Sequence, residues 1–294
     1  MKKLLCLLCA LASLASCDKP RPQQAPPEPA VAQTPATPNT KPRPMPSPKP
    51  LAWPASGFTL SPPPTVFSDD FGMHKIFLDA GHGNPGNTGN ISCLCIEEQD
   101  FNLAMAQHLA PLLTGTDHFK VRLSRNATPG PKYRPRLAAA KAFGAEVIIS
   151  IHSDVRGEGS EWSPAPGKRC MHNLDAPGFS ILWSDEGPLE LTQSRHRLAR
   201  AMAKSLTRTG FLPYGGEDYE DLYDLDPLSP GVFVDRHPPG ERIFFLRKPR
   251  IPSIIIETHH AWDPREERHF QKTSTRDAFG KALVAALEEH FSAT

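Results

Sequence analysis

Four ionisable side chains stand where apolar runs of the sequence end, or where a helix is expected to begin. His82 lies in KIFLDAGHG, just after the apolar run, His152 lies in EVIISIHSD, and Glu257 ends the run SIIIE. Glu98 lies in IEEQDFNL, at an expected helix start, where the helix dipole favours a carboxylate. Two neutral imidazoles and one carboxylate form a known catalytic zinc set with a fourth position for water. A separate glutamate can then act as a base, so the pattern predicts a metal-dependent hydrolytic site.

The elements that must position these residues form an alternating pattern of strands and helices. Short apolar runs typical of strands buried on both faces occupy residues 75–79, 120–124, 146–151, 179–184 and 253–257. Helical periodicity marks residues 98–113, 194–210 and 275–291, with Gly210 as a stop and Ser274 or Thr275 as a cap. The pattern predicts an α/β fold with a mostly parallel sheet flanked by helices. Sites in such sheets form beyond the carboxyl ends of the strands.

The N-terminus has the pattern of an export signal. Lys2 and Lys3 precede an apolar stretch that is too short to span a bilayer, which needs about 20 residues. The end of this stretch, Leu-Ala-Ser before Cys17, resembles a bacterial lipobox. We therefore expect residues 1–16 to be a lipoprotein signal peptide and Cys17 to carry lipid that anchors the chain to a membrane. The alternative is an ordinary cleaved signal followed by a cysteine at this position by chance.

Residues 17–67 are expected to be a disordered tether. Sixteen of the 33 prolines lie between Pro20 and Pro64, and the stretch has few apolar groups and no periodicity. As polyproline II it would extend on the order of 150 Å. Residues 70–294 then form a single catalytic domain.

Charge and cysteine content narrow the class of protein further. The formal net charge of +1 gives no electrostatic attraction to nucleic acid, so we expect no nucleic-acid partner. Three cysteines remain after Cys17, namely Cys93, Cys95 and Cys170. An exported protein can oxidise its thiols, and Cys170 is the plausible partner of either of the other two.

The four sites carry a resemblance to a known family. The matching motifs are Asp-Ala-Gly-His-Gly at 79–83, Glu-x-Asp-x-Asn-Leu at 98–103, Ser-Ile-His at 150–152 and Pro-x-x-x-x-Glu-Thr at 252–258. In this order they resemble the zinc-dependent N-acetylmuramoyl-L-alanine amidases, the AmiC-like cell-wall hydrolases. The resemblance covers roughly residues 73–291.

The resemblance implies a role for each of the four residues. His82, Glu98 and His152 would bind Zn²⁺, and Glu257 would be the general base for a metal-activated water. The substrate would be peptidoglycan, cut between N-acetylmuramic acid and the L-alanine of the stem peptide. Glu97 competes with Glu98 as the ligand, but the register of the helix motif favours Glu98.

Several residues depart from the family pattern or stand beside it. The loop Asn84–Gly89 differs from the usual one, and His259 and His260 replace the usual Gly-Phe. The two histidines would either contact substrate or shift the pH optimum, or be partly exposed loop residues. Arg125 would face either an anionic stem peptide or solvent.

Two segments look like insertions, residues 156–178 and the acidic residues 215–241. Some relatives carry a segment that covers the zinc until a partner removes it. An acidic side chain of 215–241 could cap the zinc in this manner. The alternative is a sugar-binding rim or a solvated loop.

The sequence thus predicts a membrane-anchored lipoprotein of the cell envelope. We expect it to face the periplasm and to remodel the wall or separate daughter cells. We expect a monomer, with a protein activator as a further partner. Two alternatives stay open: a zinc peptidase that cuts another peptidoglycan amide, and a non-catalytic wall-binding lipoprotein on the same fold.

Overall fold

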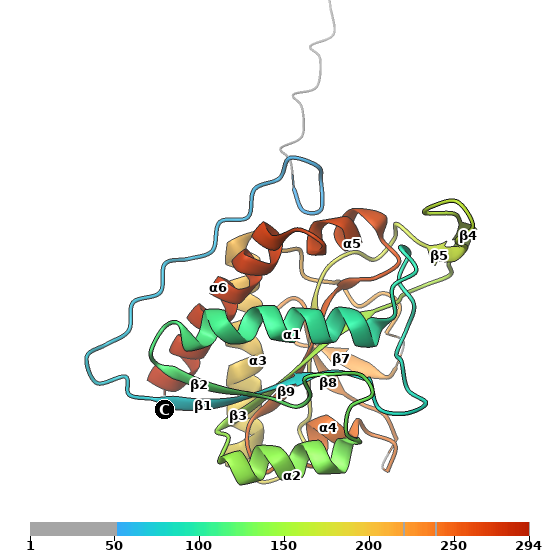
Figure 1. Cartoon of the computed structure of the whole chain (residues 1–294). Helices are drawn as coiled ribbons and strands as arrows, with labels where there is room; N and C mark the ends of the chain where they lie inside the picture. The colour runs from blue at the N-terminus through green and yellow to red at the C-terminus, as the bar shows by residue number, and fades with distance from the viewer. Residues whose placement is uncertain (1–51, 220, 239, 294) are drawn as a thin grey trace, which may run out of the picture. The chain divides into compact units, whose positions relative to one another are not determined.

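A seven-stranded sheet forms the centre of the part of the chain that the computed structural model describes, residues 52–219, 221–238 and 240–293 (Figure 1). In spatial order its strands are β2 (Phe119–Leu123), β1 (His74–Ala80), β3 (Val147–Asp154), β9 (Ser253–His260), β6 (Ser180–Trp183), β8 (Val232–Asp235) and β7 (Tyr223–Leu225). The first four run parallel, whereas β6 is antiparallel to β9 and β7 is antiparallel to β8. The prediction of a mostly parallel α/β sheet is confirmed, and it includes all five expected strands.

Helices cover both faces of the sheet, as Figure 1 shows. One face packs against α1 (Glu98–Thr114), α3 (Leu189–Thr209) and α6 (Thr273–Ser292), and the other against α2 (Tyr133–Phe143) and the short α4 (Phe244–Arg247). Alternation along β1 explains the two layers, because Ile76 and Leu78 enter the first core and Phe77 enters the second. The expected cap of α6 is wrong: the helix begins at Thr273, and its N-cap Lys272 makes no side-chain capping bond.

The chain packs against the domain well before residue 70, where the domain was expected to begin. Trp53 is 5% exposed, and its ring lies 4.9 Å from that of Phe211 and 6.0 Å from that of Phe270. Its indole N–H donates to the Glu266 carboxylate over 2.6 Å. The end of the expected tether, from residue 52 in the described chain, is therefore part of the folded unit. The expected signal and the predicted lipidation site Cys17 lie outside the described residues.

We expect Trp53→Ala to lower the free energy of unfolding by about 3–5 kcal/mol, because it removes a buried indole and takes away the donor to Oε1 of Glu266. Urea denaturation of residues 49–294 measures the change. A protein that begins at Ser68 should lose at least as much stability. Equal midpoints for the 49–294 and 68–294 proteins would show that the Trp53 contacts contribute nothing.

The first insertion is a hairpin joined covalently to the loop before Glu98. Strands β4 (Ser160–Trp162) and β5 (Cys170–His172) pair antiparallel, and Cys170 forms a disulfide with Cys95. Of the two candidate partners of Cys170, Cys95 is therefore the one that forms the disulfide, and Cys93 is a buried free thiol. The indole N–H of Trp162 adds a 2.7 Å hydrogen bond to the Cys93 carbonyl.

We expect Cys95→Ser to destabilise the oxidised protein by about 2–5 kcal/mol, because the disulfide spans a sequence separation of 75 residues and restricts the unfolded chain. Denaturation curves with and without dithiothreitol measure this. Dithiothreitol should lower the midpoint of the parent protein and leave that of Cys95→Ser unchanged. If the parent protein does not respond, the two thiols are not joined in solution.

The second insertion, 215–241, completes the sheet. It contributes β7 and β8. Val232 of β8 is buried in the first core, and Phe233 is buried in a separate cluster with Leu182, Leu246 and Ile255. The solvated-loop alternative is therefore wrong for β8, whose four residues are buried, whereas most of the described remainder of the segment is loop that is exposed or partly exposed. Among the described residues, no helix is both long and apolar enough to cross a membrane.

Candidate active site

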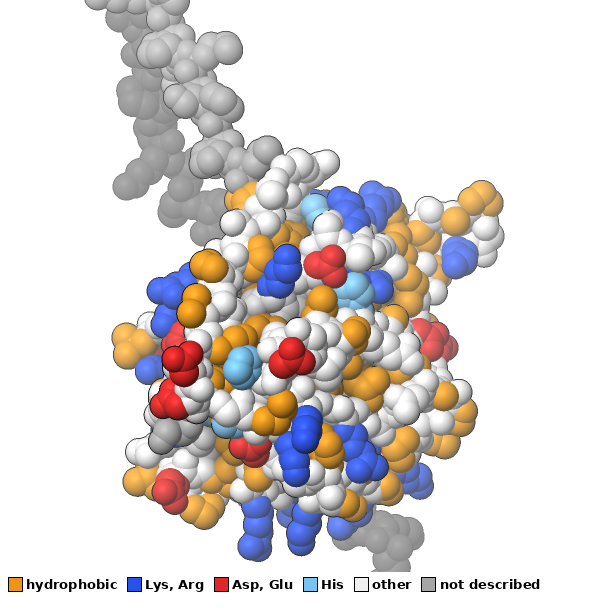
Figure 2. All heavy atoms as spheres, turned by 60° about the vertical axis from the view of Figure 1, so that its left-hand side comes forward, with side chains coloured by type: hydrophobic (Ala, Val, Ile, Leu, Met, Phe, Trp, Pro, Cys, Tyr) orange, Lys and Arg blue, Asp and Glu red, His pale blue; other side chains and the backbone are white. Residues whose placement is uncertain are grey.

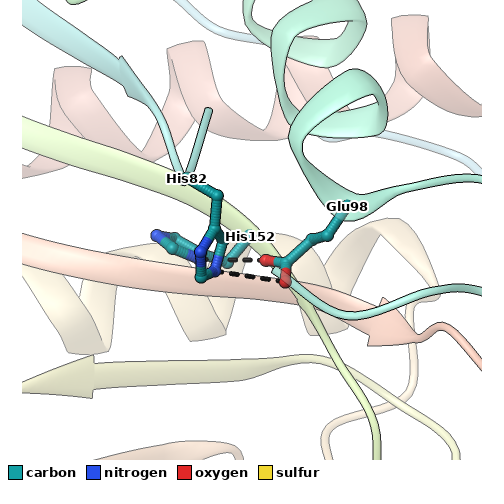
Figure 3. A group of neighbouring side chains, drawn as sticks. All are labelled: His82, Glu98 and His152. Carbon is teal, nitrogen blue, oxygen red and sulfur yellow. Dashed lines mark hydrogen bonds and ion pairs between the residues drawn. The ribbon is translucent and has the colours of Figure 1, made fainter. Parts of the chain in front are cut away.

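Three of the four sequence-predicted residues meet at one point beside the carboxyl ends of the central strands. His82 follows β1, His152 lies in β3, and Glu98 is the first residue of α1 (Figure 3). Nε2 of His82 is 3.1 Å from Oε2 of Glu98, and Nδ1 of His152 is 3.0 Å from its Oε1. One ligand atom from each residue lies within 4.8 Å of the others. The two histidines thus approach one carboxylate from different strands.

The loop after β1 fixes the position of His82. Its backbone φ is 56°, and its Nδ1 lies 2.6 Å from Oδ1 of Asn87, which can only accept a hydrogen bond. Nδ1 therefore carries the proton in the neutral ring, and Nε2 presents a lone pair toward Glu98. The residue before His82 must be glycine, because a Cβ on residue 81 would be 2.3 Å from Nε2 of His152.

Glu98 is held by donors on both oxygens and is 4% exposed. Asn90 donates to Oε2 from its backbone and its side chain, and Asn102 and the backbone of Ser153 donate to Oε1. Burial opposes the charge, but hydrogen bonds and charge from the two histidines hold the Glu98 pKa well below its ordinary value. Glu97 instead accepts a hydrogen bond from Gln99, so Glu98 is the glutamate that lies against the two histidines.

The close approach of lone pairs in this cluster indicates a cation. A neutral His82 with its proton on Nδ1 would place an acceptor 3.1 Å from a carboxylate oxygen, which is repulsive without a shared positive charge. Burial lowers the His82 pKa, yet the hydrogen bond and the charge of Glu98 raise it overall. A divalent cation supplies the required positive charge while both imidazoles stay neutral. The residues present therefore fit a bound metal.

Glu257 lies in β9, directly across from His152 of β3 in the parallel register. The two side chains therefore point to the same face of the sheet. Oε2 of Glu257 is buried without a hydrogen-bond partner among the described residues. Burial, then the carboxylates of Asp154 and Glu98, raise the Glu257 pKa well above its ordinary value, and Arg156 opposes them. A carboxyl group in this setting binds protons readily.

A polar network beside Glu257 was missed in the sequence. The Tyr219 hydroxyl donates to Asp154 over 2.7 Å and lies 2.8 Å from the hydroxyl of Ser180, the residue paired with Glu257 on the other side. Arg156 donates to Asp154 and Ser180 over 3.0 and 2.9 Å. The only sequence signal was the acid two residues after His152, in Ser-Ile-His-Ser-Asp.

This network also bears on the acidic cap expected from residues 215–241. Tyr219 of that segment packs beside Asp154, while Asp226 is paired with Arg200 and His196 elsewhere. In the described part of the segment, no carboxylate joins the cluster of His82, Glu98 and His152. The segment builds one side of the site.

Arg125 does not face a substrate or solvent. It is 4% exposed, and its guanidinium donates to the carbonyls of Ala80, Gly81 and Gln99. It joins the loop that carries His82 to the first turn of α1, which carries Glu98. The expectation of substrate contact is wrong, because the backbone carbonyls already use the donors.

His259 and His260 are not loop residues. Both lie in β9 and are fully buried, and His259 bonds to Glu267 over 2.7 Å. Neither ring nitrogen of His260 has a hydrogen-bond partner among the residues described, and burial, with Arg156 nearby, lowers its pKa to about 4. Neither histidine is exposed to a substrate. Asp79 is held in the structure by Arg136, which pairs with it over 3.0 Å.

An α/β sheet that presents two histidines, a carboxylate and a further glutamate at one edge defines a metal-dependent hydrolase. The family model of the N-acetylmuramoyl-L-alanine amidases matches residues 76–289. The chain belongs to this amidase family, and the resemblance seen in its motifs is confirmed. It is accordingly a hydrolase of peptidoglycan, and members of the family are generally metal-dependent.

Individual relatives agree with this assignment. A putative N-acetylmuramoyl-L-alanine amidase of Buchnera aphidicola is 25% identical over 74% of this chain and 95% of its own length. The amidase AmiC of Escherichia coli is 23% identical over 74% of this chain, which spans only 52% of that longer protein. The structure of the amidase Ami1 from Mycobacterium smegmatis has the same fold, with a TM-score of 0.58, 18% identity, and coverage of 76% of this chain and 99% of that one.

Proposed function

We propose that the chain is a zinc-dependent N-acetylmuramoyl-L-alanine amidase in which His82, Glu98 and His152 hold the metal and Glu257 is the general base. The observation that carries the proposal is the convergence of the three ligand atoms within 4.8 Å. Zinc suits this donor set better than magnesium or calcium, because two of the three donors are imidazole nitrogens.

Bound zinc would polarise the scissile carbonyl and lower the pKa of a bound water. The chain's own residues supply the rest. Glu257 takes a proton from the attacking water on its free Oε2 and returns it to the L-alanine nitrogen as the amide C–N bond breaks. Arg156 partly offsets the effect of Asp154 and Glu98 on the Glu257 pKa. Asn87 and Asn90 hold His82 and Glu98 in position.

The position of the enzyme in the cell follows from its substrate and its N-terminus. Peptidoglycan places its action at the cell envelope. A lipid on Cys17 and the Pro-rich segment would hold the folded unit at a membrane, facing the periplasm. A protein activator and a monomeric state remain predictions.

Product analysis tests this function. Residues 49–294, loaded with zinc, are incubated with purified peptidoglycan, and the released fragments are identified by mass spectrometry. We expect stem peptides with a free L-alanine N-terminus, and none after chelation. Fragments cut within the stem peptide would identify a peptidase instead. Wall binding without any release, in a zinc-loaded protein, would contradict catalysis and favour the non-catalytic alternative.

A further inference from the structure

A basic groove lies at the edge of the sheet opposite to the metal-site residues. It has a volume of about 460 Å³ and runs between α2 and the segment that leads into β9. Its floor is apolar and its rim is cationic. The lining residues are Leu137, Ala138, Ala140, Lys141, Ala145, Ile148, Lys248, Pro249, Arg250 and Ile251. No carboxylate is among them.

The three cations of this groove are unpaired within the described part of the chain. Lys141, Lys248 and Arg250 are exposed, and none makes an ion pair there. The groove between α3 and α6 differs in part, because two of its four cations, Arg200 and Lys204, pair with Asp226 and Glu289. Positive charge in the basic groove is therefore not neutralised by the protein itself.

The surroundings add to this charge. Exposed Lys75 lies with its ammonium 5.9 Å from the centre of the Phe143 ring at the end of α2. The nearby carboxylate of Glu146 is occupied by His74 and by the backbone N–H of Lys75. Figure 2 shows Lys and Arg side chains gathered along the lower edge of the molecule, where Figure 1 places α2 and α4.

The groove is far enough from the active site to be occupied independently. Ile148 lies near the start of β3, and His152 lies near its end. Four residues of strand separate them by about 13 Å. A ligand against the groove would leave the opposite edge of the sheet, with its metal-site residues, open to the wall polymer.

We propose that the basic groove docks the folded unit onto the surface of an anionic lipid bilayer. Three unpaired cations attract acidic headgroups. The groove places the lysines around an apolar floor of Leu137, Pro249 and Ile251, against which their methylene stems can lie while the charged ends reach the headgroups. A polar wall polymer fits less well, because these floor side chains offer no hydrogen bonds. Docking does not depend on the proposed amidase function or on lipid at Cys17.

Vesicle binding tests the proposal with unlipidated residues 49–294, which include the whole compact unit. Sedimentation is compared for phosphatidylcholine vesicles with and without phosphatidylglycerol. We expect binding only to the anionic vesicles, weakening as salt rises. The groove variant carries Lys141→Gln, Lys248→Gln and Arg250→Gln, and should bind at least about tenfold more weakly. A matched control carries Arg197→Gln, Arg208→Gln and Lys281→Gln, which are exposed cations of α3 and α6.

The control should bind like the parent protein. The proposal is overturned if the parent protein does not bind anionic vesicles. It is also overturned if both variants lose binding equally, since net charge alone would then explain the attraction. Binding to purified peptidoglycan that is lost only in the groove variant, without vesicle binding, would assign the groove to the wall polymer instead. Unchanged melting temperatures show that the variants are folded. Stem-peptide release is measured in a separate assay, so a failure of vesicle binding does not bear on the proposed amidase function.

Discussion

Glu257→Gln should lower the rate of peptidoglycan hydrolysis by a factor of about 10²–10⁴ while the protein stays folded and keeps its metal. Glutamine preserves the shape of the side chain but cannot take a proton from the attacking water. Initial rates of stem-peptide release measure the loss, and metal analysis of the same samples shows whether zinc is retained.

The same substitution makes a separate prediction about stability. Glu257 sits among Asp154 and Glu98, and its buried Oε2 has no partner in the described chain. Replacing an ionisable group in such a place should leave the melting temperature of the metal-free protein unchanged or raise it. A variant that retains more than a tenth of the parent rate, with its zinc, would assign the base to another residue.

Glu98→Gln should weaken zinc binding by at least about 100-fold and abolish hydrolysis at limiting zinc. The substitution removes the negative charge that both His82 and His152 approach to within 3.1 Å. Isothermal titration of the metal-free protein with zinc measures the affinity.

Glu97→Gln is the matched control, because it makes the same change one residue earlier and its carboxylate bonds to Gln99 rather than to the cluster. We expect this control to bind zinc like the parent protein. If the two variants lose affinity equally, or if only Glu97→Gln loses it, the ligand assignment is wrong. The pKa of Glu98 is held below its ordinary value, so in the metal-free protein its contribution to stability is present above about pH 4 and is lost as pH falls.

The sheet and the metal cluster could be predicted because local patterns encode them. Each central strand is a short apolar run with flanking turn residues, and His82 and His152 come at or just beyond the ends of such runs. Parallel strands bring these ends to one edge of the sheet, so the motif order was enough to place the residues together.

The features that sequence reasoning missed depend on partners far away in the chain. Trp53 looks like part of a linker until Glu266, 213 residues later, accepts its indole hydrogen. Arg125 and His259 looked available for a substrate because their acceptors lie on other elements. Strand β8 was hidden in an acidic stretch, since its four buried residues are flanked by charged turns. No local pattern identifies such contacts.

The most direct test of the central claim is a titration of metal-free residues 49–294 with zinc, following bound zinc and stem-peptide release in the same samples. Our account predicts that activity rises in proportion to bound zinc and saturates at about one ion per chain, as three protein ligands of a single site require. It also predicts that Glu98→Gln neither binds nor responds over the same range. Full activity in the metal-free protein, or tight zinc binding that persists in Glu98→Gln, would contradict it.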